Sequence, residues 1–527
     1  MMFHSSHSSE APSHRYTPCS SRYSLSAVPP VLGFVVACQS PSTQKSPPSS
    51  QAPSEAVECE GLRARLGTGL PFDRSNILVI LTDDIGMDHT ATWNAHPDPS
   101  YTPTLDALTC AGMSFRRAYS HPTCSPSRAT LLTGRMPSRY GIGRWLGDNG
   151  IWGLPLAEIT LPELLAERGY SAGLAGKWHL GAAVDPNAAR HMLDQGFDHH
   201  RGSFSNLMMA LGTGHTPRGY WQWERLEDGE PAWTTDYNIT TTTDDALALV
   251  DLLPEPWFLY VAYNSAHDPL HRPPDHLLID PNAVSEESED LELYRAMVTA
   301  TDLELGRLLG SIDDATLDNT LVVYMADNGT PKWGITAPLD PSRGKGTAYE
   351  GGVHVPMIWA GRGVSEISAD SSALVSFADV FPTIAALVDL DLATWQPPGG
   401  ESPLRLDGES LKPLLDDPTR DTSRSVVVSE AFFPAGPGPY QWARTTAVSE
   451  QWKYVRLEGE EATGDPDTDL REELYRIPED DPASDLWILD EGPDLRSEEV
   501  LDAEAQAAFR QLSEALDATL AARPFEY

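Results

Sequence analysis

Hydrophobic runs that end abruptly in polar residues recur along this chain. Residues 76–81, 257–263 and 320–326 are each continuous and largely apolar. Such runs are typical of strands that are buried on both faces of a parallel sheet. The polar residues that follow them are Asp83-Asp84, Asn264 to His267, and Asp327-Asn328. Because ligands bind at the carboxyl ends of the strands in open α/β sheets, the pattern predicts a site at this edge.

Helical segments alternate with these strands. Residues 161–168 have apolar positions at helical spacing and stop at Gly169, a residue type that commonly caps a helix C-terminus. Residues 291–309 form a longer amphipathic stretch. The alternation predicts an α/β fold with a large, mainly parallel sheet sandwiched by helices. We expect this domain to span residues 73–420.

The pattern changes after about residue 420. Two shorter strand-like runs, 425–428 and 452–455, are separated by turn residues, and residues 458–499 are strongly acidic. The chain closes with an amphipathic helix whose apolar face includes Leu501, Phe509, Leu512, Leu516 and Leu520. We expect a smaller C-terminal α+β domain, residues 421–527, packed on the large one.

Residues 1–38 have the layout of an export signal. Arg15 and Arg22 precede a short apolar run that ends at Cys38. Val35-Val36-Ala37-Cys38 resembles a bacterial lipobox, in which the cysteine becomes lipidated. The pattern predicts an exported protein, a periplasmic or cell-surface lipoprotein of a bacterium; an unstructured extension or a start codon placed too early is the alternative. Residues 39–72, Ser/Pro-rich in their first part, are interpreted as a tether.

Composition and charge narrow the range of partners. Of the 527 residues, 40% are hydrophobic and 22% are charged, which is ordinary for a globular protein. The 37 basic and 77 acidic residues give a formal net charge of −40. Such a field repels nucleic acid and anionic lipid, so we expect no nucleic-acid partner. The sequence contains no run of 18 or more apolar residues, so we expect no transmembrane helix.

The five cysteines are too few for a disulfide framework. A disulfide between Cys59 and Cys110 is one alternative for a protein in an oxidising compartment. Sequence does not decide it, because it does not give the distance between the two residues. No CxxC pair or His/Cys cluster suggests a zinc site.

The segment from Cys124 to Arg135, CSPSRATLLTGR, carries the most specific chemical signal. A cysteine at the entrance of a helix and close to an arginine has its thiolate favoured by the helix dipole and the nearby charge. A core cysteine beside a turn proline is the alternative. The segment resembles the signature of the type I sulfatases, C-x-P-S-R followed by L-T-G-R, within the alkaline phosphatase superfamily.

The resemblance implies that Cys124 is converted after translation to formylglycine, an aldehyde whose hydrate is the nucleophile. Cys-x-Pro-x-Arg is the pattern that the formylglycine-generating enzyme recognises, and Cys124, Pro126 and Arg128 match it. This maturation enzyme is therefore an expected partner.

Two polar pairs supply candidate metal ligands. Asp83-Asp84 and Asp327-Asn328 offer three carboxylates and an amide carbonyl, an oxygen-only set that suits Ca²⁺, or Mg²⁺, better than zinc. Either pair alone is more commonly a turn that follows a strand. Both pairs are similar to the sulfatase metal site, and the resemblance implies that these four residues and residue 124 surround the ion.

Basic residues supply the sulfate-binding part of the implied site. Lys177 and His179 lie in a G-K-W-H-L-G segment that is similar to the family's sulfate pocket. His267 matches the family's H-x-P histidine, and Lys345 matches its active-site lysine. Each of them alone would ordinarily be a surface residue. Together with Arg128 they would create a local anion site despite the negative total charge.

The resemblance extends from about residue 75 to about residue 490, and it departs from the family at His89, where an aspartate is common. It implies a sulfuric ester hydrolase that cleaves a sulfate monoester, either an aryl sulfate or a sulfated saccharide. In that mechanism Asp327 accepts a proton from the nucleophile, and His267 and Lys345 protonate or stabilise the leaving alcohol. His179 acts as a base.

Two other functions compete with this one. A phosphoester or phosphonate hydrolase of the same superfamily would use the same metal and nucleophile, although the G-K-W-H-L-G segment favours sulfate. A carbohydrate-binding relative without catalysis would have a broken nucleophile or metal pair, and neither is broken.

Overall fold

The computed structural model describes residues 58–69, 72, 74–147, 150–397, 404–420, 422, 424–459, 470–477, 501–521 and 525. The predicted export signal with Cys38 and the first part of the predicted tether lie outside these ranges, as do the predicted domain borders at residues 73 and 421. Among the described helices, none combines the length and the apolar character that crossing a bilayer requires.

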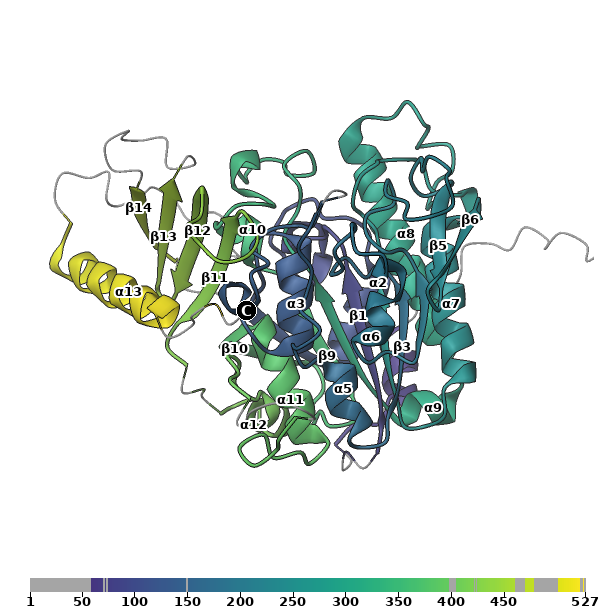
Figure 1. Ribbon diagram of the computed structural model, residues 1–527, viewed down its shortest axis with the longest axis horizontal. Coiled ribbons are helices and arrows are strands. Elements are labelled where there is room, and N and C mark those ends of the chain that lie inside the picture. The colour runs from purple at the N-terminus through teal and green to yellow at the C-terminus, as the bar shows by residue number, and fades with distance from the viewer. Residues whose placement is uncertain are drawn as a thin grey trace, which may run out of the picture. The chain divides into compact units, whose positions relative to one another are not determined.

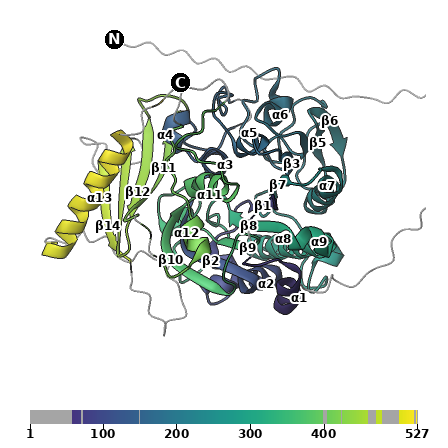
Figure 2. The same ribbon diagram turned by 90° about the horizontal axis from the view of Figure 1, so that it is seen from below.

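A ten-stranded sheet organises the larger part of the described structure (Figures 1 and 2). In spatial order its strands are β10 (Ala369–Ser376), β2 (Gly112–Tyr119), β9 (Met357–Gly361), β8 (Thr320–Ala326), β1 (Asn76–Thr82), β7 (Trp257–Ala262), β3 (Ser171–Gly176), β4 (His199–Gly202), β5 (Trp223–Glu227) and β6 (Glu230–Thr234). Neighbours from β8 to β4 run parallel, as do β10 and β2, whereas β9, β5 and β6 pair antiparallel. The predicted large, mainly parallel sheet is confirmed.

Alternate residues of β1 face two separate hydrophobic cores, because successive side chains of a strand point to opposite faces. Ile77, Val79 and Leu81 belong to one core, and Leu78 and Ile80 belong to the other. The first core includes residues of α3 (Cys124–Thr133), α4 (Pro137–Tyr140), α5 (Leu161–Ala166), α6 (His191–Asp194), α11 (Val380–Leu387) and α12 (Lys412–Asp416). The second includes residues of α1 (Cys59–Arg65), α2 (Pro103–Ala111), α7 (Asn238–Leu252), α8 (Asp290–Ser311) and α9 (Asp314–Asp318).

A smaller antiparallel sheet follows the large one. Its strands are β11 (Val427–Phe433), β12 (Trp442–Val448), β13 (Trp452–Gly459) and β14 (Leu470–Arg476), and α13 (Ala503–Ala521) covers it (Figure 1). Leu512 and Leu516 of α13 share a buried core with Tyr454 and Leu474 of the sheet. The predicted smaller α+β architecture at the C-terminus is confirmed. Short helix α10 (Glu350–Val353) lies beside β11 and β12 in Figure 1.

Helix α1 lies within residues 39–72, so the chain is folded in a part of the range predicted to be a tether. Leu62 of α1 is fully buried, and Cys59 forms a disulfide with Cys110 of α2 with a Cα–Cα distance of 5.8 Å. The Ser/Pro-rich composition that predicts a tether belongs to the residues before α1, and it carries no information about this long-range attachment.

We predict that Cys110→Ser lowers the free energy of unfolding by about 2–4 kcal/mol, because the bridge closes a loop of 51 residues and restricts the unfolded chain. Denaturant titration of the oxidised protein, the reduced protein and the variant measures the effect. The reduced protein should match the variant. Three coincident unfolding curves would contradict a stabilising bridge.

Candidate active site

Four neighbouring strands end at one edge of the large sheet, and a predicted site residue follows each of them. Lys177 comes directly after β3, His267 lies in the loop after β7, Asp83 follows β1 and Asp327 follows β8. The last residues of β1 and β8 are register partners, so the two aspartates emerge side by side. The backbone amide of Lys177 still donates to the last residue of β7, at 2.8 Å, which fixes where its side chain starts. The sheet therefore assembles the site from four distant segments.

Helix α3 brings Cys124 and Arg128 to the same edge. Cys124 is the first residue of the helix, is buried, and donates its Sγ–H to Oδ1 of Asp83 at 3.4 Å. Arg128 lies one turn later and donates to Oδ2 of Asp327 from Nε at 3.0 Å and from Nη2 at 2.8 Å. Its Nη1 donates to the backbone oxygen of Lys177 at 3.2 Å. Every residue of α3 is buried, so close packing fixes the position of Cys124.

Oxygen atoms suited to a cation gather around Cys124. One ligand atom from each of Asp83, Asp84, Cys124 and Asp327 lies within 4.8 Å of the others, and all four residues are buried. Asn328 donates from Nδ2 to Oδ1 of Asp84 at 2.8 Å. Among the described residues, neither Oδ2 of Asp84 nor Oδ1 of Asn328 has a hydrogen-bond partner. Unpartnered buried oxygens are costly, so this donor set fits a hard divalent cation.

Three cationic side chains balance the three carboxylates. Lys177 forms an ion pair with Asp83, and Nζ of Lys345 lies 2.5 Å from Oδ1 of Asp84. Together with Arg128, they leave the cluster close to neutral. The side chains of Lys177 and Arg128 are fully buried, whereas that of Lys345 is 16% exposed. A bound divalent cation would therefore make this edge attractive to an anionic ester.

Burial and neighbouring charge act together on the pKa values of the cluster. Burial favours the neutral acid at Asp83, but Lys177 and His267 outweigh it, and the pKa of Asp83 lies well below its usual range. Burial and the charge of Asp83 raise the pKa of Asp327 to about 6. Burial and the same charge raise the pKa of the Cys124 thiol. The thiolate expected from the helix entrance and the nearby Arg128 is therefore not favoured, and an unmodified thiol at this position would be protonated and a weak nucleophile.

The ring of His179 is held as a neutral imidazole. Its Nε2 lies 3.0 Å from the backbone oxygen of Leu146, an acceptor, so Nε2 carries the proton. Nδ1 is buried and has no hydrogen-bond partner among the described residues. Burial and the charge of Lys177 hold the pKa of His179 well below its usual range. Nδ1 therefore offers a lone pair that can accept a proton.

His267 lies on the exposed side of the cluster. A ring nitrogen lies within 4.8 Å of Sγ of Cys124 and a carboxylate oxygen of Asp83, and Nδ1 lies 2.9 Å from Oδ1 of Asp268. The His267 side chain is 15% exposed, so it lies on the solvent side of the cluster. The structure thus brings all ten predicted site residues to one edge of the sheet. They are Asp83, Asp84, Cys124, Arg128, Lys177, His179, His267, Asp327, Asn328 and Lys345.

His89, where the sequence departs from the family pattern, belongs to the buried surroundings of this edge. Its Nδ1 lies 2.9 Å from Oγ of Ser100 and its Nε2 lies 2.9 Å from the backbone oxygen of Gly334. Both ring nitrogens are therefore occupied by structural contacts, and the departure leaves the ligand set unchanged.

Sequence reasoning missed a buried ion pair that supports the loop of Lys345. Nζ of Lys453 on β13 lies 2.7 Å from Oε1 of Glu350, the first residue of α10. Tyr119 donates to the other carboxylate oxygen at 3.2 Å, and Nδ1 of His354 lies 2.9 Å from it. The available signal was a lysine within the apolar run 452–455, a position that rarely buries an unpaired charge.

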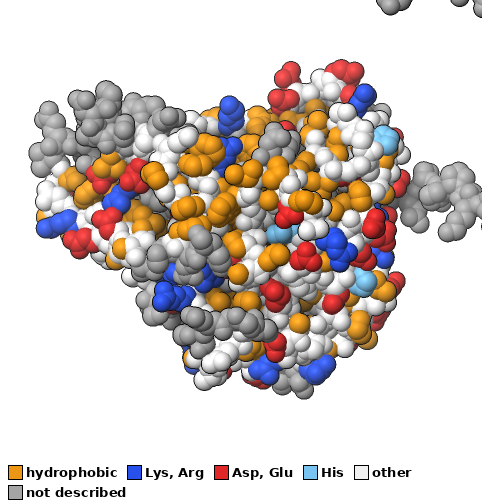
Figure 3. Space-filling view, in the orientation of Figure 1, with side chains coloured by type: hydrophobic (Ala, Val, Ile, Leu, Met, Phe, Trp, Pro, Cys, Tyr) orange, Lys and Arg blue, Asp and Glu red, His pale blue; other side chains and the backbone are white. Residues whose placement is uncertain are grey.

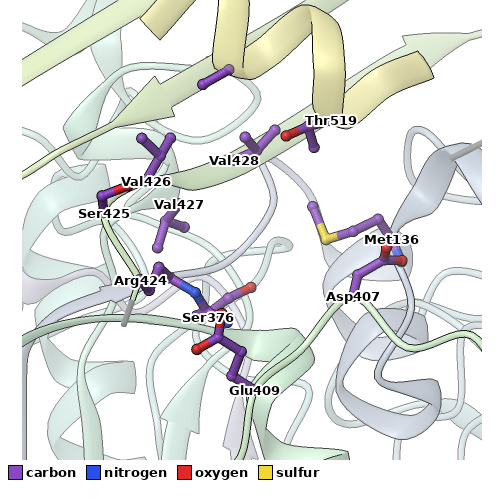
Figure 4. Close-up of a pocket in the computed structure, with 11 residues that line it drawn as sticks. Met136, Ser376, Asp407, Glu409, Arg424, Ser425, Val426, Val427, Val428 and Thr519 are labelled. Atoms are coloured by element: carbon purple, nitrogen blue, oxygen red, sulfur yellow. The ribbon is translucent and has the colours of Figure 1, made fainter. Parts of the chain in front are cut away.

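A cavity of about 340 Å³ lies next to Met136, just beyond the C-terminal end of α3 (Figure 4). It contains none of the ten site residues. Two of its charged groups are tied into structural pairs: Asp407 accepts from Arg139 at 2.8 Å, and Arg424 donates to Asp379 at 2.6 Å. Figure 4 shows Met136 and Asp407 on one side and Arg424 with residues 425–428 on the other. This cavity is bordered by residues of β10, β11 and α13 and by loop residues between them, and it is not the candidate active site.

We predict that Lys453→Met lowers the free energy of unfolding by about 3–5 kcal/mol, because Glu350 would stay buried without its cation. The double variant Lys453→Met/Glu350→Leu should recover most of the loss, since no uncompensated charge remains. Thermal or denaturant unfolding of the four members of this cycle measures the coupling. Additive losses would refute it.

Comparisons with known proteins agree with this geometry. The family model described as "Sulfatase" matches residues 75–390. Human arylsulfatase A is 32% identical over 401 residues, which cover 71% of this chain and 73% of that protein. The uncharacterised sulfatase YdeN of Escherichia coli is 31% identical over 393 residues, covering 67% and 64%.

A solved structure shows the same fold. The crystal structure of Ps i-CgsB in complex with k-i-k-neocarrahexaose is 26% identical, has a TM-score of 0.66, and covers 85% of this chain and 92% of that one. The family model alone spans more than half of the chain. The chain therefore belongs to the sulfatase family.

Proposed function

We propose that this sulfatase hydrolyses sulfate monoesters with residue 124 as nucleophile, after conversion of Cys124 to formylglycine, at a Ca²⁺ site. The observation that carries the proposal is the position of Cys124. It lies in a C-x-P-S-R segment, at the buried start of α3, and within 4.8 Å of three carboxylates. A formylglycine-generating enzyme would be required during maturation.

Asp83, Asp84, Asp327, Asn328 and residue 124 would hold the cation. Oxygen ligands and carboxylate charge favour Ca²⁺, with Mg²⁺ as the alternative. When bound, the ion would supply Lewis acidity and would lower the pKa of the nucleophile. The unpartnered oxygens of Asp84 and Asn328 support this assignment.

The cations of the site would hold the sulfate group. Matured residue 124 would supply the hydroxyl that attacks sulfur. Arg128 and Lys177 already converge on the carboxylates around residue 124, so their N–H groups are positioned to stabilise charge on the sulfate oxygens. Because the two side chains are fully buried, that stabilisation needs little reorganisation of solvent.

Four side chains would carry out the proton transfers of the reaction. Asp327 would accept the proton of the attacking hydroxyl, and His267 and Lys345, the partly exposed members of the site, would protonate or stabilise the leaving alcohol. Nδ1 of His179, which has no partner among the described residues, would act as the base that regenerates the aldehyde and releases sulfate.

The proposed substrate is a sulfated saccharide. The similar Ps i-CgsB is seen with k-i-k-neocarrahexaose, and a saccharide outside the cell suits the predicted export signal and lipidation at Cys38. We accordingly propose a periplasmic or cell-surface location. Comparing turnover of an aryl sulfate with that of the matching aryl phosphate distinguishes a sulfatase from the rival phosphoester hydrolase.

We predict that Cys124→Ala abolishes turnover of 4-nitrophenyl sulfate while the thermal unfolding midpoint changes little, because a smaller side chain replaces the nucleophile. Intact-mass analysis of the active wild-type protein should show residue 124 lighter than cysteine by about 18 Da. Protein made without the formylglycine-generating enzyme is the matched control. A fully active protein with an unmodified thiol at residue 124 would contradict the formylglycine proposal.

We further predict that Asp327→Asn loses bound Ca²⁺ and activity together, because one of three charged ligands is removed. Elemental analysis of the purified protein gives the metal content independently of turnover. Asp340→Asn, an exposed aspartate on the chain segment before Lys345, makes the same change in net charge and should retain one ion per chain. Retention of calcium by Asp327→Asn would exclude Asp327 as a required ligand.

A further inference from the structure

Segment 144–146 connects the candidate active site to its surroundings. The backbone N–H of Leu146 donates to Oγ of Ser125, the residue after the nucleophile, at 3.1 Å. The backbone oxygen of Leu146 lies 3.0 Å from Nε2 of His179. Both polar groups of Leu146 are thus occupied by the site, and the side chains of Arg144 and Trp145 start within two residues of it.

Arg144 contacts two aromatic rings. Its guanidinium carbon lies 4.6 Å from the centroid of Trp145 and 4.8 Å from that of Phe433, the last residue of β11. Stacking on two rings fixes the orientation of the guanidinium before any ligand arrives. The N–H groups that point away from the rings stay available for an anion.

The stack continues across the small sheet. Phe433 and Trp442 are register partners on β11 and β12, and their rings stack with centroids 6.3 Å apart at 25°. The guanidinium carbon of Arg444 lies 4.9 Å from the centroid of Trp442. Nη1 of Arg444 donates to the backbone oxygen of Gly346, the residue after Lys345.

These contacts form a continuous arc, which we call the aromatic–arginine wall: Trp145, Arg144, Phe433, Trp442 and Arg444. One end adjoins the segment that contacts His179, and the other adjoins the segment of Lys345. Both ends of the wall therefore meet the candidate active site. In the space-filling view hydrophobic side chains gather over the region of α3, α10 and β11, with acidic side chains mainly to either side (Figure 3).

The wall is open to solvent. Trp145 is 43% exposed, and the other four residues are half-buried. A half-exposed aromatic ring offers a flat apolar face, which is a common way for a protein to bind the apolar face of a sugar. A purely structural stack would be expected to bury its rings.

Charge supports a ligand at Arg144. Among the described residues no carboxylate pairs with its guanidinium, although the chain carries 77 acidic residues against 37 basic ones. Burial lowers the pKa of Arg144, and within the described part of the chain no anion offsets that effect. A partly desolvated, pre-oriented guanidinium is suited to bind a sulfate or carboxylate in bidentate fashion.

We propose that the aromatic–arginine wall is a saccharide subsite that binds the part of the substrate beyond the scissile sulfate, and that Arg144 binds a second anionic group there. The proposal rests on the proposed sulfatase function. It assigns the substrate class as an oligosaccharide that carries at least one sulfate or carboxylate besides the sulfate that is cleaved. Trp145 and Trp442 would contact sugar rings, and Arg144 would be a specificity-determining residue.

Binding to the inactive Cys124→Ala protein tests the wall separately from the chemistry. Titration calorimetry would compare glucose 6-sulfate, which has one anionic group, with tetrasaccharides prepared from carrageenan, chondroitin sulfate and heparan sulfate. We expect at least one tetrasaccharide to bind at least about tenfold more tightly than glucose 6-sulfate, as one well-placed charged contact provides.

Substitution of Arg144 should remove that advantage. In the Cys124→Ala background, Arg144→Gln should reduce the ratio of the two affinities about tenfold, and Arg144→Lys should retain part of it, because the charge remains while the planar guanidinium is lost. Arg510→Gln, on α13, makes the same change in net charge and should leave the ratio unaltered. Should Arg144→Gln fail to fold, the salt dependence of tetrasaccharide binding to the parent protein replaces it.

Three outcomes would overturn the subsite: no tetrasaccharide binds more tightly than glucose 6-sulfate, Arg144→Gln leaves the ratio unchanged, or tetrasaccharide binding is insensitive to salt. Turnover of 4-nitrophenyl sulfate by the matured parent protein is measured in parallel. Its absence would count against the proposed function, whereas the calorimetry reports on the wall in either case.

Discussion

Parallel pairing of β1 with β7 and β8 is the constraint on which the site depends. Asp83 and Asp327 emerge side by side because the last residues of β1 and β8 are register partners, and the amide of Asp327 continues the ladder by donating to Thr82 at 3.0 Å. A slip of one residue would turn every side chain of β1 to the opposite core. Burial of both strands on both faces therefore fixes the spacing of the ligands as well as the fold.

The same burial makes the charged carboxylates of the site costly in free energy, and neighbouring cations of the site compensate that cost. Isolated carboxylates in such surroundings would each cost several kcal/mol. Arg128 and Lys177 compensate them at fully buried positions, and Lys345 does so from the partly exposed rim. The net charge of −40 is thus irrelevant to capture of a small anion, because the local balance at this edge is near neutral and one divalent cation would tip it positive.

The sequence was informative where structure follows from local pattern. Apolar runs predicted the central strands, and the polar residues at their ends, His267 among them, predicted the ligand edge. Resemblance to the sulfatases pointed to Lys345, whose segment has no periodic signal of its own. Long-range pairings were not predictable in this way. The pair of Lys453 with Glu350 joins residues 103 positions apart, and the disulfide at Cys59 depends on a distance that only the folded chain defines. Their partners are set by tertiary packing, which local pattern does not encode.

The small C-terminal sheet supports the candidate active site from outside. Lys453 on β13 compensates Glu350 at the start of α10, and Arg444 on β12 binds Gly346, so two strands hold the segment that carries Lys345. A lysine at the rim needs such support, because its side chain loses considerable rotamer entropy when it is fixed. The edge of β12 that contacts Gly346 through Arg444 also presents Trp442 of the aromatic–arginine wall, next to Phe433 on β11. Chemistry and saccharide selectivity would then share one support, so changes on that edge that alter the substrate would also be felt at Lys345.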